Sequence, residues 1–156
     1  MLQIGSPAPE ISLKDQTGTS RTLSEFRGSY VLVYFYPKDD TAGCTKEACV
    51  IRDMYGEFDR LGVQVLGISA DSVESHKAFA EKYGLPFTLL SDPTQETISA
   101  YGAKGLVMSK RISYLVNPSG TVAKAYPNVD PTTHGGEILN GLYILTKKVP
   151  ATSNTA

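Results

Sequence analysis

Two cysteines, Cys44 and Cys49, lie five residues apart directly after a short polar turn. A cysteine reacts as its thiolate, and at the usual pKa of about 8.5 only about 3% of a thiol is ionised at neutral pH. The segment from Thr41 onward favours a helix with Thr41 as its N-cap, which makes Cys44 the third helical residue. The unpaired N–H groups and the helix dipole stabilise a thiolate at that position. The pattern therefore predicts that Cys44 is a nucleophile.

A buried strand and a long helix are predicted on either side of this turn. Residues 30–36 are continuously apolar, which is typical of a central strand covered on both faces. Residues 44–61 repeat apolar side chains at helical spacing and precede a glycine, so we expect one uninterrupted helix there. Ligand sites in such sheets gather where strands end, and the turn from Pro37 to Cys44 falls at such an end.

The remaining segments alternate between strand and helix patterns. Residues 1–12 form an extended arm, and a β-hairpin follows around the turn at residues 15–18. We expect strands at residues 63–68, 87–90, 111–116 and 121–126, the last two as a hairpin, and helical segments at 24–28, 73–83, 93–101 and 136–148. This order predicts an α/β fold with a mixed central β-sheet flanked by helices and an N-terminal β-hairpin.

Length and charge limit the possible functions. The 156 residues, 41% of them hydrophobic, suit a single domain over residues 1–149, and we expect a polar, disordered tail over 150–156. A formal net charge of -1 gives no overall attraction to nucleic acid or anionic lipid. The longest apolar run is far shorter than the roughly 20 residues of a membrane-spanning helix. No secretory signal is visible at the N-terminus, so we expect a cytoplasmic protein.

The other residues capable of chemistry show no metal-binding spacing. The two histidines, His76 and His134, lie far apart and at no ligand-like distance from the cysteines. We therefore expect no zinc site, no other metal and no cofactor. His76 is interpreted as a solvated helix residue and Asp92 as a helix cap. Either Ser72 or Asp71 can cap the helix predicted at 73–83.

The segment Tyr36-Pro-Lys-Asp-Asp-Thr-Ala-Gly-Cys-Thr-Lys-Glu-Ala-Cys49 resembles the active-site signature of the peroxiredoxins, Pro-x-x-x-Thr-x-x-Cys. The spacing of five residues between the two cysteines resembles that of the peroxiredoxin Q, or bacterioferritin comigratory protein, subfamily. The resemblance continues through residues 5–11, 13–16, 67–71, 89–92 and 111–116.

This resemblance implies a thioredoxin-like fold and thiol-dependent reduction of hydrogen peroxide and alkyl hydroperoxides. It assigns the peroxidatic role to Cys44 and the resolving role to Cys49, with an intramolecular disulfide between them. Thr41 and Pro37 match the threonine and proline of the motif, and Arg111 matches the arginine that faces the thiolate. The implied partners are a hydroperoxide and thioredoxin or a similar dithiol reductant, and the implied state is a monomer.

The chemistry of peroxide reduction also requires groups around Cys44 that stabilise the transition state. A thiolate of low pKa is also a weaker nucleophile, so ionisation of Cys44 cannot by itself make a fast peroxidase. The remaining acceleration must come from stabilising the breaking O–O bond. The Thr41 hydroxyl, the N–H groups near Gly43 and Cys44, and the Arg111 guanidinium are the groups predicted to do this, and Pro37 is predicted to shield the pocket from water.

The spacing of the two cysteines predicts a conformational change. Residues i and i+5 of an unbroken helix differ by about 7.5 Å of rise and roughly 140° of rotation, so their Cα atoms exceed the limit of about 7 Å for a disulfide. The helix must therefore unwind before Cys44 and Cys49 can bond. We expect residues 45–48 to absorb the change.

Simpler interpretations of these residues stay open. Cys44 and Cys49 could be two small buried apolar residues, or Cys49 alone a bystander. Arg111 could be a surface cation at a strand end, and Thr41 merely an N-cap. Glu47 could be a charge on the helix surface or could orient Arg111.

Two other functions compete with a peroxidase. A general dithiol–disulfide oxidoreductase is disfavoured because the Cys-x-x-Cys spacing is absent. A redox-sensing or binding module that uses the same disulfide-driven unfolding is the main alternative. Turnover of excess peroxide would indicate the peroxidase, whereas reaction that stops after one equivalent would indicate the sensor.

Overall fold

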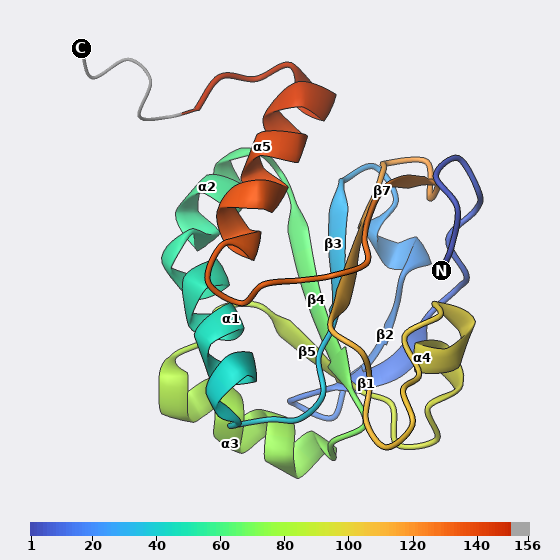
Figure 1. Ribbon diagram of the computed structural model, residues 1–156, viewed down its shortest axis with the longest axis vertical. Coiled ribbons are helices and arrows are strands. Elements are labelled where there is room, and N and C mark those ends of the chain that lie inside the picture. The colour runs from blue at the N-terminus through green and yellow to red at the C-terminus, as the bar shows by residue number, and fades with distance from the viewer. Residues whose placement is uncertain (151–156) are drawn as a thin grey trace.

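Strand β3 lies near the middle of a seven-stranded mixed sheet with the order β2-β1-β5-β4-β3-β6-β7. The computed structural model describes residues 1–150 (Figure 1). Its elements are β1 (Ser12–Asp15), β2 (Ser20–Thr22), the 3-10 helix η1 (Ser24–Phe26), β3 (Val31–Phe35), α1 (Ala42–Asp53), α2 (Tyr55–Arg60), β4 (Gln64–Ser69), α3 (Val73–Tyr83), β5 (Thr88–Ser91), α4 (Glu96–Ala100), β6 (Ile112–Val116), β7 (Val122–Tyr126) and α5 (His134–Thr146). Strands β3, β4 and β5 are parallel, and the other pairings are antiparallel.

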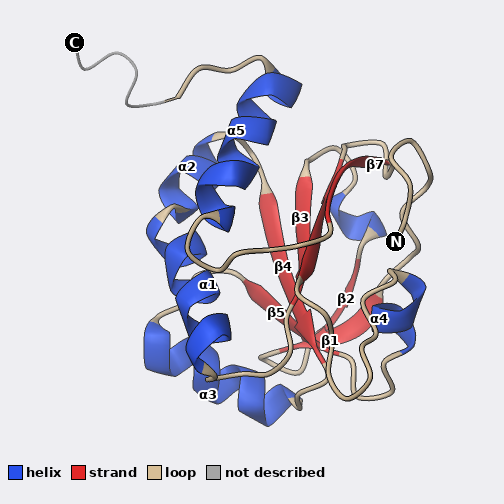
Figure 2. Cartoon of the chain, viewed as in Figure 1, coloured by secondary structure: helices blue, strands red, loops and turns tan. Residues whose placement is uncertain are grey.

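The sheet separates two hydrophobic cores, and β3 contributes to both. Leu32 and Tyr34 point into the core under α1, α2, α3 and α5, whereas Val31, Val33 and Phe35 point into the core under α4 and the N-terminal arm. Figure 2 shows the helices on both faces of the sheet. A strand covered on both faces alternates between two apolar environments, which explains the unbroken apolar run. The predicted mixed sheet flanked by helices, with an N-terminal hairpin of β1 and β2, is confirmed.

The single helix predicted over residues 44–61 is wrong, because the chain forms two helices that meet at Met54. Met54 has φ of -98° and ψ of 3°, and α2 begins at the next residue. Ile51 in α1 and Phe58 in α2 are both fully buried. The apolar period thus continues across the break, so the sequence pattern resembles one helix. At this junction α5 approaches so closely that a Cβ on Gly135 would lie 2.7 Å from the Met54 sulfur.

Two of the predicted caps differ from the structure. Helix α4 begins at Glu96 and not directly after Asp92, because Gln95 takes a left-handed conformation with φ of 62°. Asp92 still serves this helix, since its Oδ2 accepts a hydrogen bond of 2.8 Å from the Ile98 N–H. Asp71 does not cap α3. The other predicted cap, Ser72, is confirmed, because its hydroxyl accepts a hydrogen bond from the Ser75 N–H.

The expectation that His76 is solvated is also wrong, because its side chain is fully buried. His76 Nε2 lies 3.0 Å from the carbonyl oxygen of Leu90 on β5. Helix α3 buries His76 together with Phe79, three residues later, and so turns a mixed polar and apolar face toward the sheet. A histidine on such a face can be buried because both of its ring nitrogens have hydrogen-bond partners, Asp39 Oδ2 for Nδ1 and the Leu90 carbonyl oxygen for Nε2.

The ends of the chain leave two predictions untested. The predicted tail lies outside the described residues except for Pro150, and the single-domain boundary at residue 149 stays a prediction. Over residues 1–150, the longest helix is α5, and none of the helices has the length and apolar character needed to cross a membrane.

Candidate active site

Cys44 occupies the third position of α1 and is buried, with 2% of its surface exposed. Thr41 is the N-cap residue, with an extended backbone at φ of -88° and ψ of 158°. The Thr41 hydroxyl does not cap the helix but donates to the Lys38 carbonyl oxygen at 3.0 Å. The Thr41 side chain therefore leaves the N–H groups of the first turn for an anion or a substrate at Cys44. Pro37 lies half-buried at the start of the same turn.

The Arg111 side chain reaches Cys44 from the residue that precedes β6. Its Nη2 lies 3.3 Å from the Cys44 sulfur, and its Nη1 donates to Glu47 Oε1 at 2.8 Å. Arg111 directly precedes β6, whose first residue Ile112 pairs with Phe35 at the end of β3. The pairing of two central strands thus places Arg111 beside the turn that leads into α1.

Charge also favours this arrangement. Burial alone would lower the pKa of Arg111, but its hydrogen bonds and its attraction to Cys44 and Glu47 raise that pKa above the ordinary value. The guanidinium therefore keeps its positive charge next to Cys44. A fixed cation at this distance stabilises a thiolate and can hydrogen-bond a second anion at the same time.

Glu47 is a buried carboxyl group, with 1% of its surface exposed, and so it is not a surface charge. Residues three apart share a helix face, which places Glu47 on the same side of α1 as Cys44. Burial raises the pKa of Glu47 to about 7, although the hydrogen bond and attraction to Arg111 lower it. One carboxyl oxygen holds Arg111, while Oε2 and the hydroxyl of Tyr34 are buried without a hydrogen-bond partner. Glu47 thus orients Arg111 from within the core.

An open cleft of about 630 Å³ adjoins Arg111. Its other lining residues come from the β7–α5 connection and from the residue before Arg111; they are Lys110, Pro127, Asn128, Val129, Asp130 and Pro131. The helix start reaches this cleft, because a Cβ on Gly43 would lie 3.0 Å from Arg111 Nη2 and 3.8 Å from Pro131 Cγ. The β7–α5 connection carries no local motif, so sequence reasoning missed its part in the site.

Cys49 lies on α1 but is not bonded to Cys44, and both cysteines are free thiols. Cys49 is half-buried, and the helix runs without interruption from Ala42 to Asp53. Their Cα atoms are therefore further apart than the limit of about 7 Å for a disulfide. The structure brings Cys44 and Arg111 together and places Thr41 and Pro37 on the adjoining turn, but it keeps Cys49 apart from Cys44.

The sequence of this chain is similar to those of known proteins. A model of the AhpC/TSA family matches residues 4–125. Peroxiredoxin Q, chloroplastic, from Sedum lineare is 46% identical over 145 residues, which cover 90% of this chain and 78% of the relative. The putative peroxiredoxin bcp of Coxiella burnetii is 39% identical over 152 residues, which cover 90% of this chain and 99% of the relative.

A solved structure shows the same fold. It is the bacterioferritin comigratory protein of Xanthomonas campestris, described in connection with its alkyl peroxide reduction activity. The TM-score is 0.83 at 33% sequence identity, and the match covers 86% of this chain and 91% of that chain.

Proposed function

The chain belongs to the AhpC/TSA family, and from this premise we propose how its residues carry out the reaction. It has the thioredoxin-like fold of the peroxiredoxins and is a thiol-dependent peroxidase that reduces hydroperoxides. The single observation that carries the proposed mechanism is the 3.3 Å contact between Arg111 Nη2 and the sulfur of Cys44 at the start of α1.

In the first step the Cys44 thiolate attacks one oxygen of the peroxide. An S–O bond forms and the O–O bond breaks, so that the sulfur is oxidised to a sulfenic acid and the peroxide is reduced. The departing hydroxide or alkoxide takes a proton and leaves as water or an alcohol. Arg111 and the first-turn N–H groups stabilise the negative charge that moves onto the departing oxygen, and the Thr41 hydroxyl orients the peroxide.

In the second step Cys49 attacks the sulfenic acid. An S–S bond forms, the S–O bond of Cys44 breaks, and water is released. Because an intact α1 keeps the two sulfurs apart, residues 45–48 must first leave the helix. A dithiol protein such as thioredoxin then reduces the disulfide and is itself oxidised, which returns both thiols. We place this cycle within a monomer, because both cysteines belong to the same helix.

The cleft beside Arg111 favours alkyl hydroperoxides as substrates in addition to hydrogen peroxide. Val129 and Pro131 give it apolar walls, and its volume of about 630 Å³ exceeds what hydrogen peroxide needs. The described activity of the Xanthomonas campestris relative toward alkyl peroxides supports the same substrate class. The cellular location stays a prediction.

Two measurements test the proposed cycle. In the first, substoichiometric protein is supplied with excess hydrogen peroxide, thioredoxin, thioredoxin reductase and NADPH, and many turnovers are expected. Reaction that stops after one equivalent would indicate the redox sensor instead.

The second measurement is the intact mass after one equivalent of peroxide. The unsubstituted protein is expected to lose two hydrogens as it forms a disulfide, whereas Cys49→Ser is expected to gain one oxygen at Cys44. Cys44→Ser serves as the control and should gain nothing. A reduced Cys44 in both of the other proteins would contradict the mechanism.

A further inference from the structure

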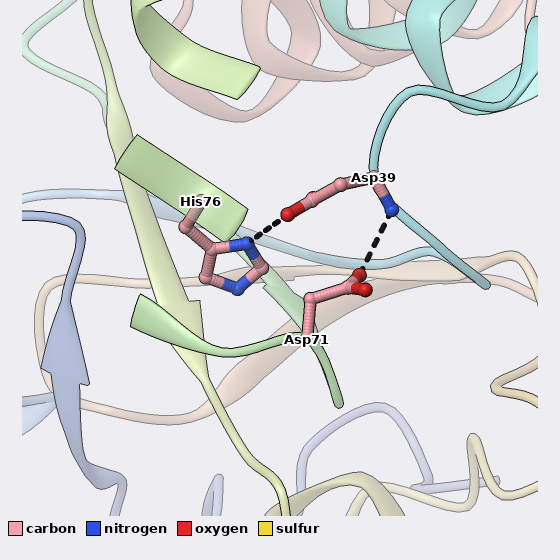
Figure 3. A group of neighbouring side chains, drawn as sticks. All are labelled: Asp39, Asp71 and His76. Carbon is pink, nitrogen blue, oxygen red and sulfur yellow. Dashed lines mark hydrogen bonds and ion pairs between the residues drawn. The ribbon is translucent and has the colours of Figure 1, made fainter. Parts of the chain in front are cut away.

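A group of buried and half-buried polar side chains contacts the turn that leads into α1, and Figure 3 shows three of its members, Asp39, Asp71 and His76. Asp39, on the turn, is 8% exposed, and both of its carboxyl oxygens are used. Oδ1 accepts a hydrogen bond of 2.6 Å from the Tyr36 hydroxyl. Oδ2 accepts one of 2.8 Å from the Ser75 hydroxyl and lies 2.6 Å from His76 Nδ1. Asp39 thus joins the turn to helix α3.

The hydrogen bonds of His76 define the charge of this pair. His76 Nε2 faces the carbonyl oxygen of Leu90, so Nε2 must carry a proton. One more proton lies between Nδ1 and the Asp39 carboxyl group, because two acceptors would not approach to 2.6 Å without it. The pair therefore carries no net charge, whichever atom holds that proton. This neutrality removes much of the cost of burying two ionisable groups.

The backbone of the turn is held as well. The Asp39 N–H donates to Asp71 Oδ2 at 2.8 Å, and the same oxygen accepts from the Ser69 hydroxyl at 2.6 Å. Ser69 is the last residue of β4, the parallel neighbour of β3. The turn is therefore tied to two different elements, α3 through the Asp39 side chain and β4 through its N–H.

These ties help to fix a turn that contains an uncommon backbone conformation. Asp40 has φ of 58°, in the left-handed region, which aspartate adopts more readily than most residues other than glycine but still seldom. An uncommon backbone conformation of this kind is kept where surrounding contacts stabilise it. Across the same turn the Thr41 hydroxyl bonds to Lys38, so the placement of that hydroxyl depends on the shape of the turn.

We propose that Asp39 is a positioning residue for the oxidation of Cys44 by peroxide, an inference that rests on the proposed function. By holding the turn against α3 and β4, Asp39 fixes where Pro37 and the Thr41 hydroxyl lie relative to the Cys44 sulfur. Its bonding partners described above are Tyr36, Ser75, His76 and Asp71, and they do not include Cys44 or Arg111. Asp39 therefore acts on the geometry of peroxide binding and not on the stabilisation of the thiolate.

The test compares two reactions of one thiol. All proteins carry Cys49→Ser, so that Cys44 is the only cysteine. One measurement is the second-order rate constant for sulfenic acid formation with hydrogen peroxide. The other is the rate constant for alkylation by iodoacetamide, which reports the thiolate but has no O–O bond to be oriented. The variants are Asp39→Ala and Asp39→Asn, and thermal unfolding is followed for each.

The neighbouring residue provides a matched control. Asp40→Asn makes the same change one position later, where the carboxyl group is exposed and bonds to Lys82 and the Tyr83 hydroxyl. Asparagine tolerates the left-handed conformation of this position. We expect both rate constants of Asp40→Asn to stay within about twofold of the parent, because exposed ion pairs contribute about 0–1 kcal/mol.

Asp39→Ala is expected to lower the peroxide rate constant by about tenfold to a hundredfold, because a displacement of about 1 Å can cost this much. Its alkylation rate should stay within about threefold of the parent. Asp39→Asn should restore most of the peroxide rate, since its amide can accept from Tyr36 and donate to a neutral His76.

Two results would overturn the inference. One is an equal fall of both rate constants in Asp39→Ala, which would indicate a merely structural role. The other is a peroxide rate constant of folded Asp39→Ala within about twofold of the parent. If Asp39→Ala does not fold, Ser75→Ala removes one bond to Asp39 and is expected to lower the peroxide rate alone by about twofold to tenfold; no change there would overturn the inference. A parent that alkylates normally but does not react with peroxide would instead refute the proposed function.

Discussion

The two sides of Cys44 are held in different ways. The turn before it is fixed by side-chain hydrogen bonds to distant elements, such as those from Asp39 to His76 on α3 and to Asp71 after β4. The segment after it is held mainly by the local backbone bonds of α1 and by the packing of Ala48 and Ile51, with one side-chain bond to a distant residue, from Arg111 to Glu47. Opening the helix bonds of residues 45–48 breaks none of the hydrogen bonds that hold Asp39. The difference suggests that one side of the site keeps its geometry while the other side supplies the motion.

The largest expected effect concerns Arg111, the cation that contacts both Cys44 and Glu47. Arg111→Ala should lower the rate constant for peroxide reduction by about a hundredfold to a thousandfold, the usual loss when one preorganised donor to a developing oxyanion is removed. Stopped-flow oxidation of Cys44 measures it. Lys110→Ala is the matched control, because Lys110 is an exposed cation lining the same cleft. A similar loss in both variants would show that general positive charge, and not the contact to Cys44, matters.

The next prediction concerns Glu47, the buried carboxyl group that orients Arg111, and its effect on the stability of the fold. Its pKa is about 7 in the folded state and an ordinary 4.5 in the unfolded state, so the folded state binds more protons between these values. The free energy of unfolding should therefore fall as the pH rises from 4.5 to 7, by at most about 3 kcal/mol, since one pKa unit is about 1.4 kcal/mol. Glu47→Gln should remove this dependence. Urea unfolding at several pH values checks it, and an unchanged slope in the variant would contradict the assignment.

Substitution of Thr41 tests whether the hydroxyl held by the turn takes part in peroxide reduction. Thr41→Val keeps the shape but removes the hydroxyl that bonds to Lys38, and it should slow peroxide reduction by about tenfold, the value of one hydrogen bond made in the transition state. Thr41→Ser retains the hydroxyl and is the control, expected within about threefold of the unsubstituted protein. Equal losses in the two variants would show that the methyl group and not the hydroxyl is required.

Gly43 gives the smallest expected effect. Alanine favours a helix over glycine by about 1 kcal/mol, so Gly43→Ala should stabilise the start of α1. Its Cβ would lie 3.0 Å from Arg111 Nη2, and the guanidinium must move by a few tenths of an ångström. We expect a loss of peroxide rate below about tenfold together with a small gain in thermal stability. A faster reaction would contradict the contact between the helix start and Arg111.

Local signals in the sequence predicted the parts of the site that depend on neighbouring residues. The apolar run of residues 30–36 indicates a central strand, which the structure has at Val31–Phe35, and Thr41 as N-cap places Cys44 third in its helix, as the structure has it. Both follow from short-range rules of burial and helix termination. Arg111 was assigned by family resemblance, because no local pattern connects it to Cys44, 67 positions away.

The parts that could not be predicted depend on how distant elements pack. The burial of His76 requires that Asp39 and Leu90 arrive at its two ring nitrogens, which only the order of strands β3, β4 and β5 brings about. Glu47 can be buried because Arg111, which directly precedes β6, donates a hydrogen bond to it. The break at Met54 preserves the apolar period, so the sequence contains no signal for it.

Hydrogen exchange in the thiol and disulfide forms tests most directly the claim that the helix opens while the turn stays fixed. In the thiol form, the amides of residues 45–48 should be protected. In the disulfide form they should exchange as rapidly as an unstructured chain, whereas the Asp39 N–H, bonded to Asp71, should stay protected in both. Protection of residues 45–48 in the disulfide form, or loss of protection at Asp39, would contradict the account.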